Sequence, residues 1–352
     1  MNYRYNFHNL FSLTANIDDF DGLLHAFRSR RDTDLSTRCQ FVLDNDLKIS
    51  LRKKPVFNVM LGYDGETDSV EFAYPWIRPV YARLTFGRNG FVFAFNKNYL
   101  RFSHIVAEGW QTSEVFRSVL MVALIKSGMY MVHGATVKLG DEGILIPSFA
   151  NTGKTTAAWM LAQRGAKYLT DELAVIDSHG SCLSFPCSSL VTPGLAKSLG
   201  LHLTGRQKLS MQIGKLKSKL FSLRFVTGGL RLYPEDFFEI CDSVKITKVA
   251  FIQNGVDDFR KVSLDEAITR FMAVRNFELG WDSNPYLIAE SFFNPSFDIE
   301  AFRTTERTFV SSFLSRLEEI YLVSSSSGSH YKVLENYKPQ LTPKLIPRLP
   351  QS

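Results

Sequence analysis

One short segment of the chain carries residue types that together bind phosphate groups. It ends in Gly153-Lys154-Thr155, which satisfies the end of a Walker A loop, G-x-x-x-x-G-K-[ST], with Ser148 in the place of the first glycine. In such a loop the backbone N–H groups point inward and the next helix adds partial positive charge at its N-terminus, so the loop holds phosphate oxygens. The expected phosphate-binding residues are Ser148, Phe149, Ala150, Asn151, Thr152, Gly153, Lys154, Thr155 and Thr156.

Two residue types in and after this loop predict how a bound nucleotide would be handled. Lys154 is expected to neutralise the β- and γ-phosphates of ATP, and the Thr155 hydroxyl to ligate Mg²⁺. The next acidic residues along the chain are Asp171 and Glu172. Asp171 would accept the proton of an attacking hydroxyl, and Glu172 would hold the metal directly or through water. The alternative for this pair is a solvent-exposed turn that carries two acidic residues.

The elements expected around these residues alternate between strand and helix. Residues 143–147 are short, aliphatic and bounded by turn residues, as in a buried strand. Residues 155–165 contain good helix formers and end at a glycine, and residues 167–170 and 173–176 have the pattern of strands. This order is typical of an α/β domain, in which the end of a neighbouring strand lies beside the phosphate loop. The acidic pair after residue 170 is therefore expected at the loop.

The stretch from His133 to Asp177 resembles the catalytic core of HPr kinase/phosphorylase. It has a His-Gly pair before the expected strand, the Walker A loop, and an acidic pair after the helix. The resemblance implies a P-loop core like that of phosphoenolpyruvate carboxykinase. It also implies acid/base catalysis by Asp171, metal binding by Glu172 in the position of a second aspartate, and a place for His133 near the phosphates. Residues 229–234 are similar to a segment found in related kinases.

The rest of the chain is expected to frame this core. Residues 1–110 have the pattern of a β-rich accessory region without a catalytic constellation, and they do not resemble the N-terminal domain of HPr kinase/phosphorylase. Residues 111–337 are expected to form the kinase-like domain, and residues 338–352 a proline-rich extended tail. The expected strands of the first region are 40–43, 47–51, 70–74, 80–86 and 90–95. Further on, we expect a helix from 112, a strand at 129–137, a strand at 246–253, and helices at 264–274 and 306–317.

Composition narrows the class of protein. Hydrophobic residues make up 45% of the 352 residues, which is enough for a sizeable core. The four cysteines form no C-x-x-C pattern, and the N-terminus lacks an apolar signal segment, so we expect a cytoplasmic protein without a membrane span. The net charge of +6 suits an anionic ligand but is too small to predict a nucleic-acid partner. Residues 178–234 contain no acidic residue; their basic residues are Lys197, Arg206, Lys208, Lys215, Lys217, Lys219, Arg224 and Arg231.

These patterns favour one function and leave two alternatives. The favoured function is an ATP-dependent kinase that transfers the γ-phosphoryl group to a hydroxyl, such as serine, of a protein, peptide or small molecule. A signature of the phosphorolysis reaction is not found, which favours an acceptor other than HPr. The first alternative is a nucleotide-binding regulatory module without acceptor phosphorylation. A nucleic-acid-binding protein, based on the basic segment alone, is the second, and the sequence leaves self-association open.

Overall fold

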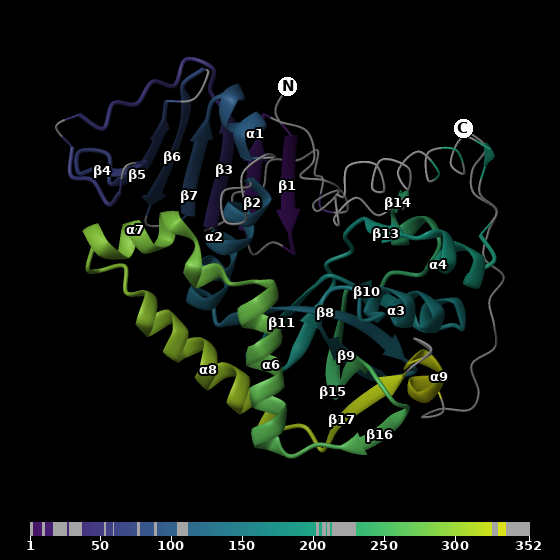
Figure 1. Cartoon of the computed structure of the whole chain (residues 1–352). Coiled ribbons are helices and arrows are strands. Elements are labelled where there is room, and N and C mark those ends of the chain that lie inside the picture. The colour runs from purple at the N-terminus through teal and green to yellow at the C-terminus, as the bar shows by residue number, and fades with distance from the viewer. Residues whose placement is uncertain are drawn as a thin grey trace. The chain divides into compact units, whose positions relative to one another are not determined.

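The computed structural model divides the chain into two compact units (Figure 1). Unit 1 comprises Met1–Phe20, Leu24–Tyr130 and Leu279–Phe309, and unit 2 comprises Asp21–Leu23, Met131–Glu278 and Val310–Ser352. Both units combine helices with β-sheets, which confirms the mixed α/β class. The structure describes residues 3–8, 11–16, 27, 37–52, 54–58, 60–75, 78–87, 90–103, 112–201, 204–205, 209, 212, 230–325 and 330–335.

Unit 1 is built on a seven-stranded sheet with the order β1-β2-β3-β7-β6-β5-β4. Phe41, Phe93, Leu84 and Val70 are successive cross-strand neighbours in four of its strands, and all are fully buried. Such a row of large apolar side chains fixes which face of the sheet belongs to the core. The strands are β1 (Tyr3–Phe7), β2 (Phe11–Ala15), β3 (Thr37–Leu43), β4 (Leu61–Asp64), β5 (Ser69–Tyr74), β6 (Val80–Gly87) and β7 (Gly90–Phe95).

Helices cover this apolar face through aromatic contacts. Phe116 of α2 lies 5.6 Å from Phe41 between ring centroids, and Tyr99 of α1 lies 5.6 Å from Phe93. Tyr286 of α7 contacts the same Phe93 at 5.5 Å. Segments far apart in the sequence therefore share one core. The helices are α1 (Lys97–Ser103), α2 (Thr112–Lys126), the short 3₁₀ helix η3 (Trp281–Ser283), α7 (Pro285–Phe293) and α8 (Ile299–Ser315), which continues into unit 2.

Unit 2 contains an eight-stranded mixed sheet and a small two-stranded sheet. The path of the large sheet is β10-β8-β11-β12-β15-β17-β16, and β9 pairs with both β8 and β15. The small sheet pairs β13 with β14. The strands are β8 (Met129–Leu139), β9 (Glu142–Pro147), β10 (Lys167–Thr170), β11 (Leu173–Asp177), β12 (Ser181–Leu183), β13 (Ser189–Val191), β14 (Leu230–Leu232), β15 (Ser243–Asn254), β16 (Asp258–Lys261) and β17 (Glu319–Ser325).

Strand directions bring four carboxyl ends to the same edge of this sheet. β9 and β10 each run antiparallel to β8, so they are parallel to each other although β8 separates them. β9 is also parallel to β15, and β15 to β17. The carboxyl ends of β9, β10, β15 and β17 therefore lie at one edge, which is where α/β proteins place ligands. From the sequence we expected β10 to neighbour β9; instead the antiparallel β8 lies between them and adds His133 to the same edge.

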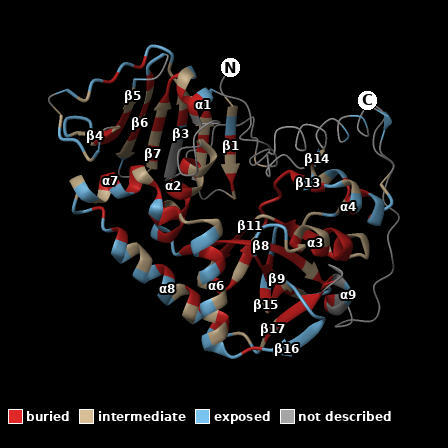
Figure 2. Cartoon of the chain, viewed as in Figure 1, coloured by how far each residue is buried: buried red, intermediate tan, exposed pale blue. Residues whose placement is uncertain are grey.

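One helix with a buried face packs against this sheet. α3 (Lys154–Gln163) buries Trp159, whose ring lies 5.6 Å from Phe237 and 5.0 Å from Phe238. Most of α3 is red in Figure 2, whereas α8 alternates between pale blue, tan and red. The remaining helices of unit 2 are α4 (Pro193–Ser198), the short 3₁₀ helix η2 (Pro234–Asp236), α6 (Leu264–Glu278) and α9 (His330–Glu335).

The expected elements are largely confirmed, with one wrong strand. Residues 47–51 were expected to form a strand, but they form no ladder. Leu47 and Ile49 are buried, so the alternation reflects burial of one side of the segment rather than pairing with a neighbour. In addition, α6 continues to Glu278 and α8 begins at Ile299, whereas we expected boundaries at 274 and 306.

Some expectations fall on residues that the structure does not describe. The proline-rich tail at 338–352 lies outside the described residues, as do Arg206, Lys208, Lys215, Lys217, Lys219 and Arg224 of the basic segment. Lys197 and Arg231 are described and exposed. Among the helices in the described part of the chain, none has the length and apolar character needed to cross a membrane.

Candidate functional site

The candidate phosphate loop connects β9 to α3 in unit 2. β9 ends at Pro147, and α3 begins at Lys154 with Gly153 as its N-cap. Gly153 has a φ of 102°, a left-handed conformation that favours glycine, and it offers no side chain to cap the helix. Helix geometry leaves the first-turn amides without acceptors inside the helix, and here they include those of half-buried Thr155 and Thr156. The loop thus ends in the arrangement that binds anions.

Ser148 fixes the start of the loop to the sheet. Its hydroxyl donates to the carbonyl oxygen of Ile252 in β15 at 2.8 Å and also contacts the Thr152 hydroxyl. Thr152 in turn donates to the carbonyl of Phe149 at 2.7 Å. Ser148 has none of the positive φ that would demand glycine; within the loop that conformation falls on Asn151, with a φ of 62°, and on Gly153. A serine at the first motif position therefore fits this loop without backbone strain.

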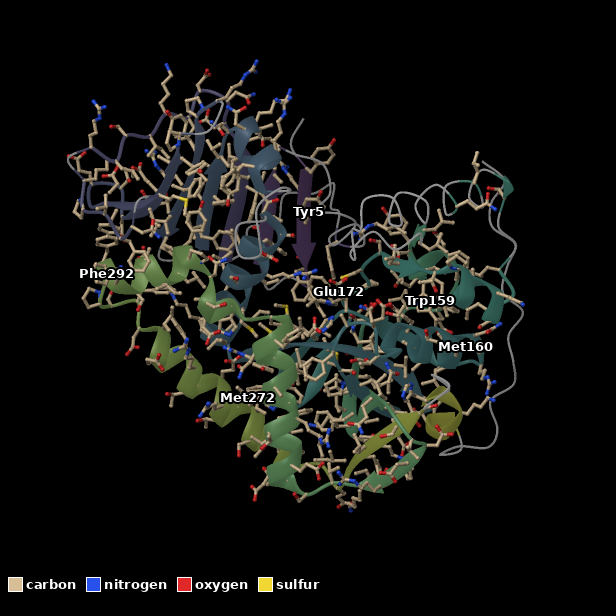
Figure 3. The ribbon with its side chains drawn as sticks, in the orientation of Figure 1. Tyr5, Trp159, Met160, Glu172, Met272 and Phe292 are labelled. Atoms are coloured by element: carbon tan, nitrogen blue, oxygen red, sulfur yellow. The ribbon has the colours of Figure 1, made fainter. Side chains whose placement is uncertain are left out.

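Lys154 and Asp171 are both buried within unit 2. Desolvation raises the pKa of the Asp171 carboxyl, while hydrogen bonding by Ser189 and Tyr168 and the nearby charge of Lys154 lower it, with a net upward shift. The Ser189 hydroxyl donates to Asp171 Oδ2 at 2.7 Å and accepts from the Trp159 indole N–H at 3.2 Å. Trp159, labelled in Figure 3, thereby links α3 to the acidic residue. The lysine and the aspartate predicted from sequence are therefore close enough for the charge of Lys154 to act on the Asp171 carboxyl.

His133 and Glu172 are brought together by the backbone. The amide of Gly134, beside His133 on β8, donates to the Glu172 carbonyl at 3.0 Å. The amide of Ser148 donates to the His133 carbonyl at 3.4 Å, so the loop, the histidine and the acidic pair are adjacent. Glu172, which is labelled in Figure 3, is half-buried and follows β10 along the chain. A Cβ at Gly134 would lie 3.1 Å from the Ile146 carbonyl oxygen, so glycine permits this close approach.

Glu278 is a member of the site that sequence reasoning missed. Its Oε1 accepts a hydrogen bond from the Ala150 amide in the loop at 2.6 Å, and its Oε2 lies 3.4 Å from His133 Nδ1. The neighbouring Phe277 contacts the exposed Phe149 of the loop edge to face, with centroids 5.6 Å apart. Glu278 is the last residue of α6, beyond the helix end expected from sequence, so no local signal pointed to it. The Glu278 carboxylate therefore accepts from an amide that could otherwise donate to a phosphate oxygen.

His330, at the start of α9, was also missed. It is fully buried, and its Nε2 donates to the Gln253 carbonyl at the end of β15 at 2.8 Å. That bond leaves Nδ1 as the acceptor of the neutral ring, and this atom has no hydrogen-bond partner among the described residues. A Cβ built on Gly153 would lie 3.4 Å from Nδ1. His330 therefore lies against the glycine of the candidate phosphate loop.

Within the described part of the chain, no three His, Cys, Asp or Glu side chains converge as metal ligands.

The sequence comparisons assign no function to the chain. No protein-family model matches the chain, and no curated protein matches it at a significant level. The function must therefore be argued from the residues gathered around the loop.

Proposed function

We propose that the chain is an ATP-dependent kinase with a P-loop core like that of HPr kinase/phosphorylase, acting on a hydroxyl such as serine. The observation that carries the proposal is the convergence of the Walker A residues with Asp171 at one edge of the sheet. A phosphate loop alone binds nucleotides, whereas a buried carboxylate beside it provides a base for transfer. Bound Mg²⁺-ATP would supply the phosphoryl group and neutralise part of its charge.

The residues at the loop fit a triphosphate. The first-turn amides of α3 would hold phosphate oxygens, and the Lys154 ammonium would neutralise their charge. The Thr155 hydroxyl and the Glu172 carboxylate are the proposed metal contacts. Mg²⁺ commonly keeps several waters and takes only one or two protein ligands beside substrate phosphates, so it does not require a cage of protein ligands.

Asp171 would take the proton from the acceptor hydroxyl. Burial raises its pKa, which makes it a stronger base than an exposed aspartate, and Ser189 holds its carboxylate in one orientation. Because the base must be ionised, turnover is expected to rise with pH through a midpoint above the ordinary aspartate range. Measuring the initial rate across pH with the purified chain checks this expectation. A rate that is flat through the acidic range would contradict it.

Labelling with γ-labelled ATP tests the proposal. The full chain, Mg²⁺ and a cell extract are incubated together, and the labelled acceptor is identified by mass spectrometry. Lys154→Ala is expected to abolish labelling, and the exposed Lys197→Ala serves as the matched control. Loss of one charge-assisted contact alone weakens binding roughly 10- to 100-fold. Labelling by Lys154→Ala at the wild-type rate would overturn the role of the loop.

One observation favours a second function, a nucleotide-dependent regulatory module. Asp171 is 3% exposed and its Oδ2 already accepts from Ser189, so an acceptor hydroxyl would need access to a buried carboxylate. A module of this kind would bind nucleotide and change a partner interaction without acceptor chemistry. Nucleotide binding together with the absence of any labelled acceptor would support it over the kinase.

A further inference from the structure

Unit 1 contains a cavity that is separate from the phosphate loop. Its volume is about 460 Å³, within the range of pockets that bind small organic molecules. Its walls combine apolar and aromatic side chains with polar ones, and they come from the sheet, α2, α7, the segment after α7 and α8. Phe86, Phe91, Val119, Val122, Phe297 and Phe302 contribute to these walls.

The polar side chains of the cavity include a buried carboxylate. Glu290, on α7, lines the cavity and is fully buried. Its Oε1 accepts from the Asn294 amide at 3.0 Å, whereas Oε2 has no hydrogen-bond partner among the described residues. A buried polar atom without a partner is costly, so a cavity beside it provides room for a ligand group that satisfies it.

Other charged groups determine which ligand fits. Asp68 also lines the cavity, and its carboxylate accepts from the Tyr63 hydroxyl. Lys126 also lines the cavity and is exposed, with its ammonium 5.9 Å from the Phe297 ring centroid and 5.6 Å from that of Phe302. These contacts show that the ring faces receive a cation. The cation on these rings is the protein's own Lys126, so the carboxyl groups of Asp68 and Glu290 are what favour a positively charged ligand group over an anion.

We propose that this cavity is a binding site for a small organic ammonium compound, with the ammonium group on Glu290 Oε2 and an apolar or aromatic body against the phenylalanine walls.

Proton linkage gives the site a signature that a merely apolar pocket lacks. Burial raises the pKa of Glu290 to about 7; Asp68 also raises it, while Asn294 and Lys126 lower it. Tyr63, whose hydroxyl donates to Asp68, is a further titratable group beside the carboxyl groups of Asp68 and Glu290. An ammonium ligand requires ionised Glu290, so its affinity should increase as the pH rises toward and through about 7. A neutral ligand of the same shape has no such requirement.

The test compares two probes with the full chain by isothermal titration calorimetry at pH 6 and pH 8. Phenethylamine is the cationic probe, and phenethyl alcohol is its neutral isostere. We expect phenethylamine to bind at pH 8 with a dissociation constant of roughly 1 mM or tighter, the range open to a ligand of this size. It should bind about tenfold more tightly than the alcohol, the size of one charge-assisted hydrogen bond. The preference should shrink at pH 6, where binding should release protons.

Variants connect this preference to Glu290. Glu290→Gln should remove the preference for the amine, whereas Glu300→Gln, at an exposed position of the same unit, should keep it. Val122→Phe, which fills the cavity, should weaken both probes. Equal binding of the two probes to the wild-type chain at pH 8, or no binding of either, would overturn the proposal without any variant. A preference that survives in folded Glu290→Gln would do the same.

Discussion

At the scale of single residues, Glu278 places a carboxylate on the candidate phosphate loop. Its Oε1 accepts from the Ala150 amide at 2.6 Å, a donor that a phosphate oxygen could otherwise use. A negative charge at this position opposes a triphosphate, and partial burial limits its screening by salt. Nucleotide binding and the Glu278 contact are therefore expected to compete.

Glu278→Gln should increase the affinity for Mg²⁺-ATP. The amide of glutamine can still accept from Ala150 but carries no charge, and we expect about three- to tenfold tighter binding, equal to roughly 1 kcal/mol of removed repulsion. Titration calorimetry with a non-hydrolysable ATP analogue measures the change, and the exposed Glu318→Gln is the control. Weaker binding by Glu278→Gln would show that the carboxylate assists the ligand instead.

Residues of the site differ in how far the sequence could predict them. The Walker A residues and the Asp171-Glu172 pair were predictable because their spacing along the chain reflects one strand, loop and helix. Glu278 and His330 were not, because they reach the loop from elements more than a hundred residues away. No local pattern distinguishes a helix-terminal glutamate at a site from one in solvent. Their roles depend on tertiary contacts alone.

At the scale of elements, the position of the loop depends on β9 packing tightly between β8 and β15. Gly143 of β9 makes this possible, because a Cβ there would lie 2.4 Å from the Lys245 carbonyl oxygen. The contacted atom belongs to the backbone of the neighbouring chain segment, which cannot rotate away. An alanine would force the two segments apart.

Gly143→Ala is therefore expected to lower the free energy of unfolding by about 2 to 4 kcal/mol, the range of overpacked core substitutions. Gly255→Ala is the control, because nothing lies within 4 Å of a Cβ there. Its change should remain below about 0.5 kcal/mol, as at ordinary surface positions. Urea denaturation of both variants measures the difference. Equal stabilities would contradict the close approach at Gly143.

Element types were more predictable from sequence than strand pairing. Short aliphatic and alternating runs gave β5, β6, β7, β8 and β9 because burial leaves a local periodicity. The same signal produced the wrong strand at 47–51, where Leu47 and Ile49 are buried without a ladder. The antiparallel position of β8 between β9 and β10 has no local signal either. Pairing depends on which segments meet in three dimensions.

At the scale of the whole molecule, the compact units are not contiguous in sequence. Residues 279–309, like residues 111–130, belong to unit 1, whereas from the sequence we expected both within a domain at 111–337. Tyr286 reaches the apolar face of the first sheet at Phe93, which explains their place. Domain boundaries predicted from a sequence are placed at shifts in composition. Composition does not show that a later segment packs against an earlier part of the chain. The stability of unit 1 consequently depends on residues from two separate parts of the sequence.

Glu290, one of these returning residues, predicts how stability depends on pH. Its pKa is raised from 4.5 to about 7 in the folded state, so the folded state holds a proton more tightly than the unfolded state. The resulting stabilisation is fully present below about 4.5 and is lost as the pH rises through about 7. Glu290→Gln is neutral at every pH. Its free energy of unfolding should exceed that of the wild type by about 2 to 3 kcal/mol at pH 8.

The two proteins should be nearly equal in stability at pH 4, because Glu290 is then protonated in the wild type as well. Chemical denaturation at both pH values provides the comparison, with Glu300→Gln as an exposed control. A stability difference that does not change between pH 4 and pH 8 would contradict a buried, titrating Glu290.

The most direct test of the kinase proposal is Asp171→Asn, measured for transfer and for binding. Asparagine keeps the shape and can still accept from Ser189, but it cannot take a proton. Transfer from γ-labelled ATP should fall roughly 10²- to 10⁴-fold, the usual contribution of a general base. Mg²⁺-ATP binding should persist, and the exposed Asp236→Asn should be active. Undiminished phosphoryl transfer by folded Asp171→Asn would contradict the account.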